Sequence, residues 1–213
     1  MLQPSKNWGL EIPRFNEPDL FLISQWADAR LLEEAMTEVR QKYATILEKV
    51  VELVQEKHRE FNSHSIQLRN VGVNVGIGKE SWRSKTGYYI SGIWIAGIRI
   101  DNLTAEDEES PYKVIWVNHP DGAVDVEEAK TRIRDAAKII LNKDDFARLG
   151  DDFGKGVGGI WYPTQNSRSQ LFELLVKDDA RGFISNVVAE FESMIRFTAV
   201  LDEIHSAGKR GRN

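Results

Sequence analysis

The strongest periodic pattern in the chain lies between residues 32 and 53. Apolar residues recur there at alternating spacings of four and three, at Leu32, Met36, Val39, Tyr43, Ile46, Val50 and Leu53. This spacing places them along one face of an α-helix and predicts a helix of about 30 residues. Leu47, Val51 and Val54 widen the apolar face. We therefore expect the helix to pack on a sheet or on other helices, with a coiled-coil arm as the alternative.

The middle of the chain shows the period of two that is typical of β-strands. Between residues 70 and 77, β-branched residues alternate with glycine and asparagine, so one face of this strand is bulky and the other nearly bare. Further strands are predicted at 88–100 and 112–119. The connections are too short for crossover helices, which predicts an antiparallel meander. The strand at 88–100 is apolar on both faces and is expected to be central.

Helical patterns return in the C-terminal half. Asp125 and Glu128 match a capping box at the start of one helix, and Ser167 and Gln170 match another. A last long helix is predicted to carry the apolar residues found between 183 and 204.

These patterns together predict an α+β fold, in which an antiparallel β-meander at about 65–119 packs against a long N-terminal helix and C-terminal helices. The length of 213 residues favours a single domain over 1–213. A polar, glycine-rich connector at 142–166 is the expected hinge, and residues 208–213 form a basic tail.

Composition excludes several classes of site. The chain has no cysteine, which rules out disulfides, cysteine-bound zinc, iron–sulfur clusters and a thiol nucleophile. The first residues contain no apolar signal segment, and the apolar run at 87–98 is too short to cross a bilayer. We therefore expect a cytoplasmic protein that does not bind membranes. The net charge of −5 argues against a surface that grips nucleic acid as a whole, but not against a local basic patch.

Two oppositely charged loops flank the strand predicted at 88–100. The first is a basic and aromatic hairpin, 78–87, with candidate binding residues Lys79, Trp82, Arg83 and Lys85. An exposed indole among cations could clamp a phosphate backbone and stack a base; a solvated hairpin whose indole folds back onto the sheet is the alternative. The second loop carries Glu106, Asp107, Glu108 and Glu109. Opposite charges at the two ends could orient a charged partner during encounter, although a charge run is also typical of a solvated loop.

Candidate catalytic residues do not converge in the sequence. Residues 120–130 spell the nuclease-like string P-D…E-x-K, but a helix turns Glu128 and Lys130 about 200° apart. Two Asp-Asp-Phe triplets, at 144–146 and 151–153, could gather a hard cation or simply cap helices and turns. His119, at a strand end beside Asp121, is the best candidate for a general base.

The favoured hypothesis is a non-enzymatic cytoplasmic subunit or regulator that binds another macromolecule, and the expected partner is a protein. No catalytic residue, metal ligand or cofactor is assigned. The long helix could also pair with a second copy. The first alternative is a nucleic-acid-binding protein that uses the basic hairpin 78–87. The second is a metal-dependent hydrolase or nuclease built on His119, Asp121 and an aspartate from 144–152.

Trp94 and Trp116 lie on neighbouring predicted strands, where they could stack across the sheet.

Overall fold

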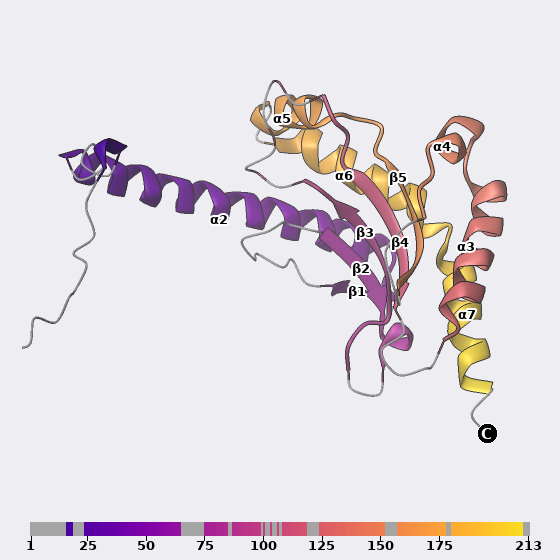
Figure 1. Cartoon of the computed structure of the whole chain (residues 1–213). Coiled ribbons are helices and arrows are strands. Elements are labelled where there is room, and N and C mark those ends of the chain that lie inside the picture. The colour runs from indigo at the N-terminus through magenta and orange to yellow at the C-terminus, as the bar shows by residue number, and fades with distance from the viewer. Residues whose placement is uncertain are drawn as a thin grey trace, which may run out of the picture. The chain divides into compact units, whose positions relative to one another are not determined.

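The computed structural model describes residues 16–18, 24–64, 75–84, 87–98, 100, 103, 106, 108–118, 124–151, 157–177 and 180–210. The chain forms two compact units, 1–41 and 42–213, and each is described by itself. Helix α2 (Trp26–Lys57) is 32 residues long and contributes residues to both units, which confirms the long N-terminal helix (Figure 1).

Within the described residues, the second unit contains a five-stranded antiparallel sheet whose strands lie in chain order. The strands are β1 (Phe61–His64), β2 (Val75–Lys79), β3 (Ser91–Ala96), β4 (Tyr112–Asn118) and β5 (Val157–Pro163). Ile93 of β3 lies opposite Ile77 on one side and Ile115 on the other. The predicted α+β fold and its meander are confirmed, and β3 is the central strand as expected.

Strand β5 lies inside the segment that the sequence assigns to a polar connector. Val157–Pro163 pairs with β4 along its whole length, from Tyr112 opposite Pro163 to Asn118 opposite Val157. The connector interpretation is wrong for these residues because two glycines hide the alternation of a strand. Gly158 has a structural reason: a Cβ there would lie 2.8 Å from the carbonyl oxygen of Val126 in the next layer. A hinge within 142–166 stays a prediction.

Helices of the second unit cover one face of the sheet, either directly or, for α5, through contacts with α6. They are α3 (Val126–Ile140), α4 (Lys143–Ala147), α5 (Arg168–Val176), α6 (Arg181–Ile195) and α7 (Thr198–Arg210), with a short 3-10 turn, η1 (Glu80–Trp82), after β2. Residues Ser91, Lys113 and Gly158 share the inner face, and they meet α7, α6 and α3 respectively. The core therefore lies between this face and the helices.

The C-terminal helical region is interrupted. The sequence predicts one long helix over 183–204, but the structure has α6 and α7 joined by a turn at Arg196 and Phe197. The apolar spacing continues through the turn, since Phe191, Met194, Phe197 and Leu201 are all fully buried. No glycine or proline marks the break. The prediction of one helix is therefore wrong, and periodicity alone could not have corrected it.

The opposite face of the sheet carries aromatic residues and glycines. Trp94 and Trp116 meet edge to face with their ring centroids 5.1 Å apart, as the expected cross-strand contact requires. Tyr112 and Trp161 meet in the same way at 4.9 Å. The indole of Trp94 covers the bare position Gly76 of β2, because a Cβ there would lie only 2.3 Å from that ring.

In the described part of the chain, no helix combines the length and the apolar character that crossing a membrane requires.

Candidate functional site

Trp82 of the basic hairpin is buried. Its side chain has 0% exposure, and its indole N–H donates a hydrogen bond of 2.8 Å to Asp202 on α7. Lys79 donates to the other oxygen of the same carboxylate, also at 2.8 Å. Of the two hypotheses for this hairpin, the exposed indole is therefore wrong. The ring packs against Phe61 of β1, as the hypothesis of an indole folded back onto the sheet requires. Burying the ring removes a large apolar surface from water, and Asp202 satisfies its one donor.

Of the other two cations of the hairpin, Arg83 has intramolecular partners and Lys85 lies outside the described residues. Arg83 donates to the hydroxyl of Tyr89 at 3.0 Å, and its guanidinium lies 3.1 Å from a carboxylate oxygen of Glu80. Lys85 lies outside the described residues. The structure thus gives Lys79, Trp82 and Arg83 intramolecular partners and does not place them together on an open basic surface.

The acidic loop lies against the start of α5. Arg168, the first residue of that helix, forms an ion pair of 3.3 Å with Glu109 and donates its backbone N–H to the Glu109 carbonyl. The hydroxyl of Ser169 donates to Glu108 at 3.4 Å. Carboxylates near the N-terminus of a helix stabilise it, so both glutamates have a structural role. Glu106 is exposed, and Asp107 lies outside the described residues.

The residues of the hydrolase hypothesis are only partly placed. His119, Asp121 and Asp152 lie outside the described residues. Asp145 forms an ion pair with Arg148, and Asp151 forms one with Arg134. Among the residues that the structure describes, no three histidine or acidic side chains are arranged to hold a metal ion.

The sequence patterns did not reveal a polar cluster that holds α7 on the sheet. His205 Nε2 lies 2.6 Å from the hydroxyl oxygen of Ser91, and both side chains are buried. The ring of Trp82 stacks on the imidazole, with centroids 6.4 Å apart. A serine beside a histidine is the beginning of a nucleophile–base pair, but Ser91 has 0% exposure and no substrate can reach it in this arrangement.

A buried ion pair under α6 was also missed. Lys113 Nζ lies 2.8 Å from Glu190 Oε2, and the two side chains are 2% and 5% exposed. The second oxygen of Glu190 accepts the backbone N–H of Gln165 at 2.7 Å. Lys113 also lies 4.6 Å from the ring of Tyr162, and burial raises the pKa of that phenol. Lys113 is two residues before Ile115 and four before Val117, so all three lie on the same face of the strand. This spacing is the sequence signal that could have placed the lysine on the inner face.

In the first unit, helix α2 exposes an apolar stripe. Leu31, Leu32, Met36 and Val39 are 58%, 62%, 43% and 50% exposed, and we call them the α2 stripe. Leu32, Met36 and Val39 follow the spacing of four and three that directs side chains to one helix face. In the second unit, by contrast, Tyr43 of the same helix is 2% exposed and packs against Phe183. The stripe is therefore an apolar helix face that the described residues of its own unit leave open.

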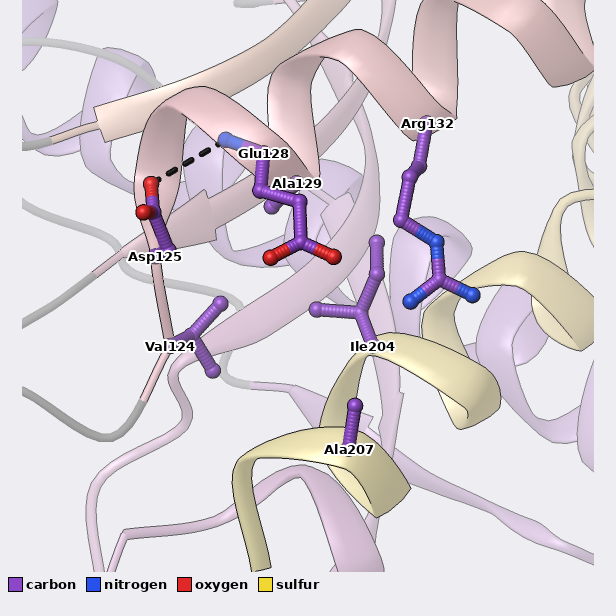
Figure 2. A pocket seen from close by; sticks show the side chains of 7 residues that line it. All are labelled: Val124, Asp125, Glu128, Ala129, Arg132, Ile204 and Ala207. Carbon is purple, nitrogen blue, oxygen red and sulfur yellow. Dashed lines mark hydrogen bonds between the residues drawn. The ribbon is translucent and has the colours of Figure 1, made fainter. Parts of the chain in front are cut away.

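A small pocket lies between α3 and α7, which run side by side (Figure 1). Its volume is about 150 Å³, and its lining residues are Val124, Asp125, Glu128, Ala129, Arg132, Ile204 and Ala207. Figure 2 shows the carboxylate of Glu128 and the guanidinium of Arg132 on the same side, above Ile204. One half of the predicted capping box is confirmed, because the side chain of Asp125 accepts the backbone N–H groups of Glu127 and Glu128. The side chain of Glu128, which the other half would use, faces the pocket (Figure 2).

The chain matches no family model, no curated protein and no solved structure. In the described part of the chain, the α2 stripe and the α3–α7 pocket both offer open surface to another molecule. The charged hairpin and the acidic loop are tied into the fold by most of their described residues.

Proposed function

We propose that the protein is a non-enzymatic cytoplasmic subunit or regulator that binds another protein through the α2 stripe. The observation that carries this proposal is the exposure of four large apolar side chains on one short stretch of helix. Exposed apolar side chains gathered on one face are typical of interaction sites, whereas scattered ones need no explanation. The heptad-like spacing favours an amphipathic helix as the part of the partner that binds.

Intramolecular pairing in the basic hairpin supports a protein partner over nucleic acid. Base stacking needs an aromatic face in solvent, and Trp82 has none. Phosphate binding needs cations that face outward, and the ammonium of Lys79 is held by Asp202. Arg83 is likewise engaged by Glu80 and Tyr89. In the acidic loop, the described residues Glu106, Glu108 and Glu109 are exposed.

The test is a pull-down of the full chain from its native cell lysate, with and without nuclease. A stoichiometric protein that survives nuclease and is lost with Met36→Glu supports the proposal. Nucleic acid recovered in the untreated arm, with no protein retained after nuclease, would overturn it in favour of the nucleic-acid alternative. Sedimentation of the purified chain separates a different protein from a second copy, since a dimer that Met36→Glu dissociates would make the partner another copy.

A further inference from the structure

We propose that the α3–α7 pocket receives a lysine side chain of the partner protein. This inference rests on the proposed function, because it adds a second contact to the same protein partner. The pocket has a volume of about 150 Å³. This is much smaller than a typical cofactor or drug-like ligand site, which has roughly 300–1,000 Å³. A volume of this size suits one side chain rather than a whole cofactor.

The floor of the pocket is apolar. Val124, Ala129 and Ile204 are 7%, 1% and 4% exposed, and Ala207 completes the lining from α7. A fully polar ligand would gain nothing from this floor. The four-carbon stem of a lysine would be removed from water against it, while the ammonium stays at the rim.

The rim carries more negative than positive charge. Among the lining residues that the structure describes, the one cation is Arg132, and it is already paired with Glu203 on α7 at 2.7 Å. Asp125 accepts the backbone N–H groups of Glu127 and Glu128 at the start of α3. The carboxylate of Glu128 forms no hydrogen bond or ion pair with any side chain in the described part of the chain, and it points over the floor (Figure 2).

These charges select the type of ligand. An anion entering the pocket would meet the carboxylates of Asp125 and Glu128, and the guanidinium of Arg132 already has an ion-pair partner. A cation with an apolar stem satisfies the unmatched Glu128 and covers Val124 and Ile204 together. Lysine fits better than arginine, because a compact ammonium can approach one carboxylate from above, whereas a planar guanidinium is suited to two-oxygen pairing and would lie beside Arg132.

The probe is a capped Gly-Gly-Lys-Gly-Gly peptide, and its control has norleucine in place of lysine. Binding to the full-length chain is followed by NMR chemical-shift changes at Ala129 and Ala207. We expect saturable shifts with the lysine peptide and affinity at least tenfold weaker with norleucine, which lacks the charge. Glu128→Gln should weaken lysine binding by about two- to fivefold, the range of an exposed ion pair. Glu127→Gln removes the same charge one residue away, outside the lining, and should leave the affinity unchanged.

A second pair of variants tests the apolar floor. Ala207→Leu fills the pocket and should abolish the shifts, whereas Ser206→Leu adds the same side chain to the neighbouring exposed position and should not. The proposal is overturned if the lysine peptide produces no saturable shifts, or if both glutamate variants weaken binding equally, which would indicate general attraction to a negative surface. If a partner is captured through the α2 stripe but the peptide does not bind, the proposed function stands and only the proposal for the pocket is rejected.

Discussion

The imidazole Nε2 of His205 lies 2.6 Å from the hydroxyl oxygen of Ser91, and this bond joins the C-terminal helix to the central strand of the sheet. Asp202, one turn earlier on α7, accepts hydrogen bonds from Trp82 and Lys79. Two successive turns of α7 are therefore fastened by polar groups within an otherwise apolar layer. The side chains of Trp82, Ser91 and His205 are buried, and buried polar groups are costly to leave without partners, so the cluster should control how firmly α7 is held.

Asp202→Ala should lower the free energy of unfolding by about 1–3 kcal/mol, because it leaves the buried N–H of Trp82 and the ammonium of Lys79 without their acceptor. Urea unfolding measures this loss. Glu203→Ala is the matched control, since it removes a neighbouring carboxylate that is 68% exposed. The control should change stability by no more than about 0.5 kcal/mol. Equal losses in the two variants would contradict the anchoring role of Asp202.

Lys113→Met should be strongly destabilising, by about 3–5 kcal/mol, since it leaves Glu190 charged and buried. Adding Glu190→Gln should recover part of that loss, because the neutral amide oxygen still accepts from Gln165. The measurement is a double-mutant cycle by chemical unfolding. Additive losses would show that the 2.8 Å pair is not energetically coupled.

Glu192 should make stability depend on pH in the acid range. Partial burial opposes the ionisation of this carboxyl, but hydrogen bonds from His58 and Lys57 outweigh it and hold the pKa below its usual value. A lowered folded-state pKa contributes stability above the unfolded-state pKa, and this contribution is lost as pH falls through the folded-state pKa. Melting temperatures of Glu192→Gln and the wild type should therefore differ at neutral pH and converge in acid. A constant difference at every pH would contradict this.

Gly76→Ala should destabilise the sheet by about 1–3 kcal/mol, because its Cβ would overlap the indole of Trp94. The distance from that Cβ to the ring is 2.3 Å, too short for small adjustments to relieve. In a Trp94→Leu background the same substitution should cost less. Thermal unfolding of the four proteins measures the difference, and an unchanged cost in the leucine background would locate the conflict elsewhere.

The sequence was sufficient for the long helix and the central strands because both patterns are local. Spacings of three and four extend through α2, and alternation of apolar residues identifies β3 and β4. Strand β5 was missed because Gly158 and Gly159 carry no side chain to show which face they occupy. Their lack of a Cβ is explained by the closeness of α3 and β4, a tertiary relationship that no window of sequence contains.

Candidate site residues were harder to predict because charge and aromaticity do not reveal exposure. The sequence left open whether Trp82 and Lys79 form an exposed basic surface. The structure decides this because Asp202, more than one hundred residues further along the chain, accepts hydrogen bonds from both. The α2 stripe has the same apolar pattern as the buried part of its helix. Periodicity identifies the face, and only the three-dimensional arrangement shows that Leu32 and Met36 are uncovered while Tyr43 is not.

The most direct test of the proposed function compares partner binding by two single variants of α2. Met36→Glu places a charge in the α2 stripe, whereas Thr37→Glu places the same charge on the adjacent exposed residue, away from the stripe. Both should melt at the wild-type temperature, because neither residue is buried. We expect Met36→Glu to weaken capture of the protein partner by about tenfold or more, since a charge would be desolvated in an apolar contact, and Thr37→Glu to retain it. Undiminished capture by Met36→Glu would contradict the central claim that the α2 stripe is the docking surface.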